Sequence, residues 1–238
     1  MVRRIKEVAQ ATRSHLLDTA ELVFAQRGVS GTSLAEIAKT AGLTRGAIYW
    51  HFTDKADLFN AMMDRVILPL EYTGRLAAAG SSNAASATSA ASDSSGRVPT
   101  APKAQEASPA SPPPSLAQMR ARFVAVLERV VADPQVARVF GIATHKVEYV
   151  GEMNAVRARH VSVRNACLAE VEATLDAAMR RGELTRQMPA PAAAIGLHAL
   201  LDGLLQNWML DPQAFKLVRV GTQVLDAYLA GLAADAAD

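Results

Sequence analysis

The stretch LAEIAKTAGLTRGAIYWH, residues 34–51, has the spacing of two short helices that cross at a steep angle. Such a crossing needs a small residue where the two backbones meet, a glycine that can take a positive φ in the turn, and an apolar anchor on the second helix. Ala38, Gly42 and Ile48 supply these three features in that order. The pattern predicts a helix-turn-helix whose second helix, at 44–51, has its first residues free to enter the major groove of DNA.

The leading end of this second helix carries residue types that read DNA. Arg45 can donate two hydrogen bonds to guanine, and Gly46 has no side chain to hold the helix away from the bases. Tyr49 offers a hydroxyl to a phosphate and a ring to a thymine methyl group. We therefore predict DNA contacts from Thr32, Ser33, Thr44, Arg45, Gly46, Tyr49, His51 and Lys55.

The aromatic residues of the segment allow a second interpretation. Tyr49, Trp50 and Phe52 could form a compact aromatic core beside an incidental arginine. Even in the DNA-binding interpretation we expect Trp50 to pack against the first and fourth helices, because a large indole is more often buried than exposed.

The rest of the chain has helical periodicity with hardly any alternation of the β type. A first helix is expected to end at Gly28, the capping-box spelling SLAE at 33–36 starts a second, and a fourth starts at Asp54. Later helices are expected at about 116–130, from Pro134 onward, and at about 152–181, 191–209 and 213–229. The predicted fold class is all-α, with about nine helices.

One segment departs from this pattern. Between residues 80 and 115 the chain is almost only Ala, Ser, Pro, Thr and Gly, which cannot bury enough apolar surface to offset the entropy of ordering it. We interpret it as a disordered insert. It lies within a predicted helical ligand-binding and dimerisation domain at 56–238, which follows a helix-turn-helix domain at 1–55. Pro69 predicts a kink or break in the fourth helix.

Residues 28–59, GVSGTSLAEIAKTAGLTRGAIYWHFTDKADLF, resemble the DNA-binding signature of the TetR family of bacterial transcriptional repressors. HKVEYVGEM, at 145–153, and LLDGLLQNWMLDPQAF, at 200–215, are similar to the AcrR-type branch, which represses multidrug efflux-pump operons. The resemblance implies a homodimer with an N-terminal three-helix DNA-binding unit and a C-terminal helical ligand domain. It also implies a palindromic double-stranded DNA operator and a small-molecule inducer that releases the protein from it.

The residues support a dimer independently. The helix at 191–209 is apolar nearly all round and must be covered on both sides, either within a monomer or in a four-helix interface with a second copy. For the dimer, we predict an interface that includes Ile195, Leu201, Leu205, Val218, Leu225 and Tyr228.

A multidrug pocket needs adaptable apolar walls and a few polar or acidic groups. The resemblance places it among the fourth helix and the helices that hold Phe140, Thr144 and Asp202. Asp202 could instead pair across the dimer, and His145 could donate to a backbone carbonyl. Where some relatives present a glutamate on the fourth helix, this chain has Ile67, with Glu71 nearby as a substitute. The predicted ligand contacts are Met63, Ile67, Phe123, Phe140, Thr144, His145, Glu148, Asp202 and Trp208.

Other function classes find little support. The chain has no nucleophile elbow, phosphate loop or zinc-ligand spacing, so we expect no enzyme, metal or cofactor. Its most apolar run is too short to span a membrane, and the single Cys167 suits the cytoplasm. Two alternatives stay open: an architectural DNA-binding protein with little sequence preference, and a TetR-family regulator answering to a fatty-acid or CoA-like ligand. In the preferred hypothesis, ligand shifts the fourth helix and so changes the separation of the two recognition helices.

Overall fold

The structure is a computed structural model that describes residues 2–66 and 112–234. These residues form nine α-helices and one short 3-10 helix, with a single isolated β-bridge between Leu184 and Ala233, so the predicted all-α class is confirmed. The elements are α1 (Val2–Arg27), α2 (Leu34–Thr40), α3 (Arg45–His51), α4 (Lys55–Met63), α6 (Leu116–Ala132), α7 (Pro134–His145), η1 (Gly151–Met153), α8 (Asn154–Arg180), α9 (Ala190–Leu210) and α10 (Leu217–Gly231).

Local capping fixes the boundaries of the short N-terminal helices. Ser33 and Glu36 form the expected capping box at α2, with the Ser33 backbone N–H donating to Glu36 Oε2 at 2.8 Å. Thr44 and Asp54 cap α3 and α4 through their side-chain oxygens. Gly28 ends α1 with a φ of 78°. The predicted starts and stops in this region are confirmed.

One boundary prediction is wrong, because α10 starts at Leu217 and not near residue 213. The Asp211 carboxylate accepts a hydrogen bond from the Gln213 backbone N–H, and the Asp211 carbonyl accepts one from Ala214. These two bonds close a local turn that competes with helix formation, so the helix begins only after it.

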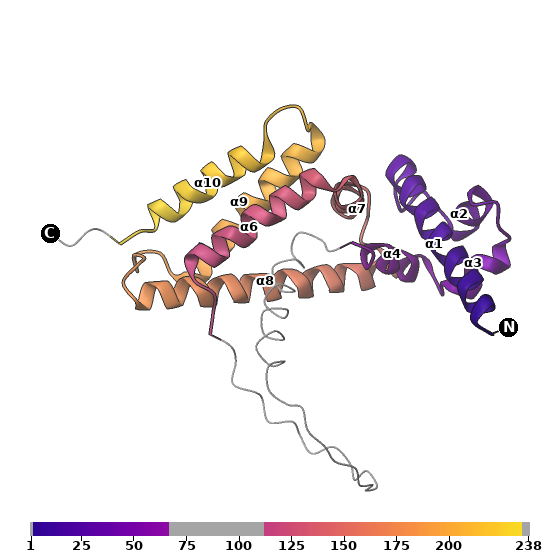
Figure 1. Ribbon diagram of the computed structural model, residues 1–238, viewed down its shortest axis with the longest axis horizontal. Coiled ribbons are helices and arrows are strands. Elements are labelled where there is room, and N and C mark those ends of the chain that lie inside the picture. The colour runs from indigo at the N-terminus through magenta and orange to yellow at the C-terminus, as the bar shows by residue number, and fades with distance from the viewer. Residues whose placement is uncertain (1, 67–111, 235–238) are drawn as a thin grey trace, which may run out of the picture.

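The N-terminal helices form one end of the molecule (Figure 1). α2 and α3 pack on α1 around a core that includes Phe24, Ile37 and Ile48, all completely buried. Ala38 is buried where α2 meets α3, and Gly42 turns the chain between them with a φ of 70°. The helix-turn-helix predicted from the spacing is therefore confirmed.

The C-terminal helices form an elongated bundle in which α8 runs from α4 to the opposite end, α6 and α9 lie beside it, and α10 packs on α6 and α9 (Figure 1). α10 approaches α6 so closely at Gly221 that an added Cβ would collide with the Leu127 side chain. Within the described part of the chain, no helix is both long and apolar enough to cross a membrane. Ile67, Pro69, Glu71 and all but the last four residues of the predicted insert at 80–115 lie outside the described residues.

Candidate DNA-binding surface and ligand domain

The outer face of α3 holds the side chains predicted to read DNA. Ile48 is completely buried against α1 and α2, whereas Tyr49 is 46% exposed and Arg45 is also exposed. The Arg45 guanidinium carbon lies 5.4 Å from the centre of the Tyr49 ring, within the range of a cation–π contact. This contact places the arginine against the exposed Tyr49 on the outside of the helix.

Gly46 is exposed on the same face. A Cβ added there would meet only the Thr44 hydroxyl oxygen, at 3.9 Å, among atoms within 4 Å. The fold itself therefore does not require glycine at this position. The missing side chain instead leaves room for a molecule that approaches α3 from outside.

The prediction that Trp50 packs into the core is wrong. Its side chain is 72% exposed and makes an edge-to-face contact with His51, with ring centres 4.5 Å apart. Successive helical residues are rotated by about 100°, so Trp50 points about 200° away from the inward-facing Ile48. Phe52, the residue that ends α3, is buried and occupies the interior position instead.

His51 lies beside a cation that sequence reasoning missed. The Arg13 guanidinium carbon lies 5.0 Å from the centre of the Phe52 ring, next to His51. Partial burial, and secondarily the charge of Arg13, lower the pKa of His51 below its ordinary value of 6.5. His51 can therefore offer a neutral N–H to a phosphate at pH 7, while Arg13 supplies positive charge on this side of α3.

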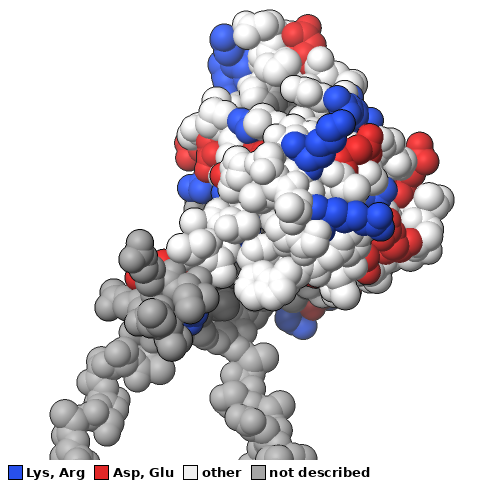
Figure 2. All heavy atoms as spheres, turned by 90° about the vertical axis from the view of Figure 1, so that its right-hand side faces the viewer, with Lys and Arg blue, Asp and Glu red and all other residues white. Residues whose placement is uncertain are grey.

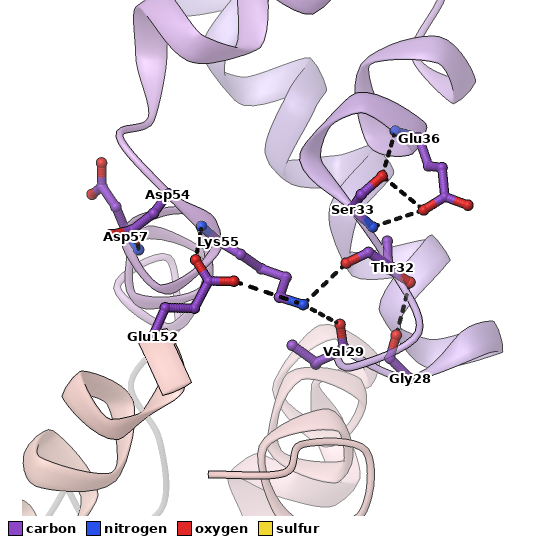
Figure 3. Close-up of polar contacts among 9 residues, drawn as sticks. All are labelled: Gly28, Val29, Thr32, Ser33, Glu36, Asp54, Lys55, Asp57 and Glu152. Carbon is purple, nitrogen blue, oxygen red and sulfur yellow. Dashed lines mark hydrogen bonds and ion pairs between the residues drawn. The ribbon is translucent and has the colours of Figure 1, made fainter. Parts of the chain in front are cut away.

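Two residues predicted to contact phosphates have their polar groups engaged inside the protein (Figure 3). Thr32 is buried and its hydroxyl donates to the Gly28 carbonyl at 2.8 Å. The Lys55 side chain is only 14% exposed, and its ammonium donates to the carbonyls of Val29 and Thr32 at 3.0 and 3.1 Å. The exposed Ser33 also has an internal partner, since its hydroxyl donates to Glu36 at 2.8 Å.

Charge on this end of the molecule is mixed. Figure 2 shows Lys and Arg side chains interspersed with Asp and Glu over a largely uncharged surface. Residues 1–55 hold eight Lys and Arg against five Asp and Glu, so the excess of positive charge is modest. Contacts of individual side chains on α3 therefore matter more for recognition than a broad basic patch.

In the described part of the ligand domain, Phe123 lines two hollows. One, with a cavity volume of about 20 Å³, lies among α6, α9 and α10. The other, of about 10 Å³, lies between α6 and α8 and has Arg122 and Glu170 on its wall. These two residues form a partly buried ion pair that sequence reasoning missed, because they are 48 residues apart.

The other predicted ligand residues are scattered. Met63 and Phe140 are buried in the core, and Trp208 is partly buried. Thr144 donates its hydroxyl to the Phe140 carbonyl at 2.8 Å, and Asp202 accepts a hydrogen bond from Gln206. The remaining two described candidates, His145 and Glu148, are exposed near the N-terminal helices, and their assignment to the ligand stays a prediction.

The predicted dimer interface is partly wrong. Three of its residues, Leu201, Leu205 and Leu225, are buried within the protomer. Leu201 and Leu225 line the hollow beside Phe123. Tyr228 and Val218 are partly buried, and the Tyr228 hydroxyl donates to the Ala193 carbonyl at 2.8 Å. Ile195, by contrast, is 59% exposed.

A larger apolar groove, of about 450 Å³, runs along α9 and α10. Its lining includes Leu200, Gly203, Leu204, Phe215 and Val224. The helix α9 is apolar nearly all round because one side faces its own core and the other side contributes to this groove.

Comparison with known proteins places the chain among transcriptional regulators. Residues 16–62 match the family described as bacterial regulatory proteins, tetR family, and residues 114–233 match the MAATS-type transcriptional repressor, C-terminal region. The chain is 34% identical over 218 residues to the HTH-type transcriptional regulator TtgR of Pseudomonas putida, covering 92% of this chain and 90% of the relative. The protein belongs to the TetR family. It is a ligand-responsive repressor that binds operator DNA and acts as a dimer.

Further relatives match most of the chain. The HTH-type transcriptional regulator AcrR of Shigella flexneri is 36% identical over 225 residues, covering 91% of this chain and 87% of the relative. Among solved structures, NalD, the secondary repressor of the MexAB-OprM multidrug efflux pump in Pseudomonas aeruginosa, is 26% identical with a TM-score of 0.72. The alignment covers 96% of this chain and 98% of NalD. A complex of SmeT with triclosan has a TM-score of 0.68 at 25% identity, covering 94% and 93% of the two chains.

Proposed function

We propose that this TetR-family protein represses a multidrug efflux-pump operon and leaves its palindromic operator when a small hydrophobic or cationic drug binds. The observation that carries the proposal is the extent of the similarity to TtgR and AcrR. It continues through the ligand domain, matched at 114–233, and is not confined to the helix-turn-helix. Inducer choice resides in that domain, so similarity there bears on the ligand class.

On the DNA side, we assign base contacts to Arg45, Gly46 and Tyr49 and phosphate contacts to Thr44 and His51. All five residues lie in or next to α3, and Arg45 and Tyr49 already stack on its outer face. The exposure of Trp50 adds a sixth candidate, since an indole edge and N–H can meet a thymine methyl group or a phosphate.

Release from DNA would act through the boundary that we place between residues 55 and 56. α4 begins at that boundary and packs against both α1 and α8, so a movement of the ligand domain can reach the DNA-binding helices through α4. Two recognition helices that bind successive major grooves are about 34–36 Å apart, and a ligand that favours another spacing weakens operator binding.

We propose that the protein acts by binding alone, without catalysis. Its place of action would be the cytoplasm, on the nucleoid while it is bound to DNA. Both statements follow from the role of an operator-binding repressor in bacteria.

The test is fluorescence polarisation of a labelled DNA fragment from upstream of this protein's own gene, at fixed salt, first against unlabelled random DNA and then with three ligands. Ethidium is the cationic probe, triclosan the uncharged phenolic probe, and palmitoyl-CoA the anionic metabolic probe. Specific binding released by ethidium or triclosan is the expected result. Release by palmitoyl-CoA alone would replace the efflux role with a metabolic one, and equal competition by random DNA would favour an architectural protein.

A further inference from the structure

The connection between α7 and α8, residues 146–153, contacts the turn that leads from α1 to α2. The Val29 backbone N–H donates to the Lys146 carbonyl at 2.8 Å, which joins the two segments directly. Val29 is completely buried, and the turn that follows it leads to Ser33, the N-cap of α2. The position of this turn therefore sets where α2, and through it α3, begins.

Lys55 holds the same turn from the other side. Its ammonium donates to the carbonyls of Val29 and Thr32, which satisfies two of its three N–H donors (Figure 3). A lysine fixed in this way is poorly placed to bind a phosphate. Its largely buried side chain and two carbonyl partners are instead typical of a residue that fixes backbone geometry.

Glu152 of the ligand domain closes the arrangement. Its Oε1 lies 3.9 Å from the Lys55 ammonium nitrogen, and its Oε2 accepts a hydrogen bond of 3.3 Å from the Lys55 backbone N–H at the first turn of α4. A carboxylate at this place is favoured both by the ammonium and by the positive end of the helix dipole. The glutamate is 45% exposed, so its contacts can form and break as the domains move.

The connection that carries Glu152 is itself braced. The Tyr149 hydroxyl lies 3.1 Å from the Ala143 carbonyl oxygen of α7 and 2.7 Å from His160 Nδ1 of α8. Movement of α7 or α8 is thereby transmitted to residues 146–153, and from there to Lys55 and the α1–α2 turn.

We propose that Lys55 serves operator binding as a positioning residue, tied by Glu152 to the ligand domain, and that it is not a phosphate ligand. The inference rests on the proposed operator binding. It names the residues through which the ligand domain controls the placement of the recognition helix. It also predicts effects that differ in sign from those of simple electrostatics.

The decisive variant is Glu152→Gln, with Glu148→Gln as its matched control. Both remove one negative charge from the same exposed connection, and electrostatics alone predicts equal or tighter DNA binding for both. If Glu152 positions Lys55, then Glu152→Gln weakens operator binding by about fivefold, because each protomer of the dimer loses a partly exposed charge pair. Binding of random DNA and the Tm stay unchanged, which separates positioning from a general loss of stability.

The second variant, Lys55→Met, distinguishes positioning from phosphate binding. We measure the slope of log K against log salt concentration for operator binding. The expected result is weaker operator binding with an unchanged slope. If Lys55 instead bound a phosphate in each protomer, the variant would reduce the slope by about 1.8, at about 0.9 per phosphate, and would overturn the proposal.

Hydrogen exchange supplies a readout that needs no DNA. Amide exchange of the peptide covering 29–33 is expected to accelerate in Glu152→Gln and to stay unchanged in Glu148→Gln. Unchanged exchange in both variants would refute the tie between Glu152 and the turn. If the wild-type protein failed to prefer its operator, the proposed function would fail while the exchange result still decided the structural claim.

Discussion

The DNA-binding end and the ligand domain of this protein differ in how far apart in sequence their contacting residues lie. At the DNA-binding end, three successive helices are capped by residues three positions apart, such as Ser33 with Glu36 and Asp54 with Asp57. In the ligand domain, the comparable polar contacts join distant segments, as Arg120 does with Asp226, 106 residues further on. The helix starts of the first region are specified locally, and the arrangement of the helices in the second depends on the packing of the whole bundle.

The largest expected effect tests whether the two regions also differ in stability. Ile48→Ala removes a completely buried side chain from the core shared by α1, α2 and α3, and should lower the free energy of unfolding of this end by about 2–5 kcal/mol. The substitution Val131→Ala, at a side chain of α6 that is 48% exposed, should change it by no more than about 0.5 kcal/mol.

The two tryptophans allow each region to be followed separately in urea. Trp50 lies on α3 and Trp208 on α9. A Trp208→Phe background therefore leaves Trp50 to report on the DNA-binding end, and a Trp50→Phe background leaves Trp208 to report on the ligand domain. Ile48→Ala should shift the Trp50 transition more than the Trp208 transition. Equal shifts would mean that the two regions unfold as a single unit and do not differ in stability.

The next effect concerns recognition. Arg45→Ala should reduce the preference for operator over random DNA by about 1–3 kcal/mol for each base that Arg45 reads, while the dimer stays folded. Polarisation competition with random DNA measures this difference, and Arg180→Ala, an exposed arginine at the end of α8, is the control. If Arg45→Ala lost affinity for all DNA equally, its assignment to base contact would be wrong.

The local character of the DNA-binding end explains what could be predicted there from the sequence. Ala38, Gly42 and Ile48 fixed the crossing of α2 and α3, and the caps fixed the helix starts. The errors concern side-chain direction and partners: Trp50 points outward, and Lys55 points inward to carbonyls 23 and 26 residues earlier. Such partners cannot be read from spacing along one helix.

The ligand domain was predictable only as a set of helices. Apolar periodicity located α6, α8 and α9, yet it could not tell which apolar face meets its own core and which faces outward. Leu201 and Leu225 were therefore expected in the interface but lie inside, whereas Ile195 lies outside. The ion pair of Arg122 with Glu170 joins two helices whose register is set by packing, so no local pattern marks it.

A smaller effect tests the importance of local capping. Ser33→Ala removes the side-chain oxygen that accepts from the Glu36 backbone N–H and should destabilise the DNA-binding end by about 1 kcal/mol. Ser115→Ala removes the equivalent cap of α6, where a long helix is also held by tertiary packing. We expect Ser115→Ala to destabilise the ligand domain less than Ser33→Ala destabilises the DNA-binding end. A larger loss at Ser115 would show that capping matters as much in the bundle as in the short helices.

The smallest expected effect is the pH dependence of stability that His51 gives to the DNA-binding end and His198 gives to the ligand domain. Burial is the main cause that lowers the pKa of each below 6.5, so the folded state favours the neutral imidazole. The unfolded chain then binds more protons as the pH falls below 6.5, and the stabilisation present above that pH is lost as the pH falls through the lowered folded pKa.

His51→Gln should therefore flatten the fall in stability below pH 6.5 as reported by Trp50, and His198→Gln should do so as reported by Trp208. The effect should be weaker for His51, which is less buried than His198. At His198, burial lowers the pKa while Asp202 opposes that shift. With His198 in place, Asp202→Asn should therefore steepen the fall in stability of the ligand domain below pH 6.5. Thermal melts between about pH 5 and pH 8 measure both slopes. A substitution at one histidine that altered both reporters equally would mean that protonation couples the two regions.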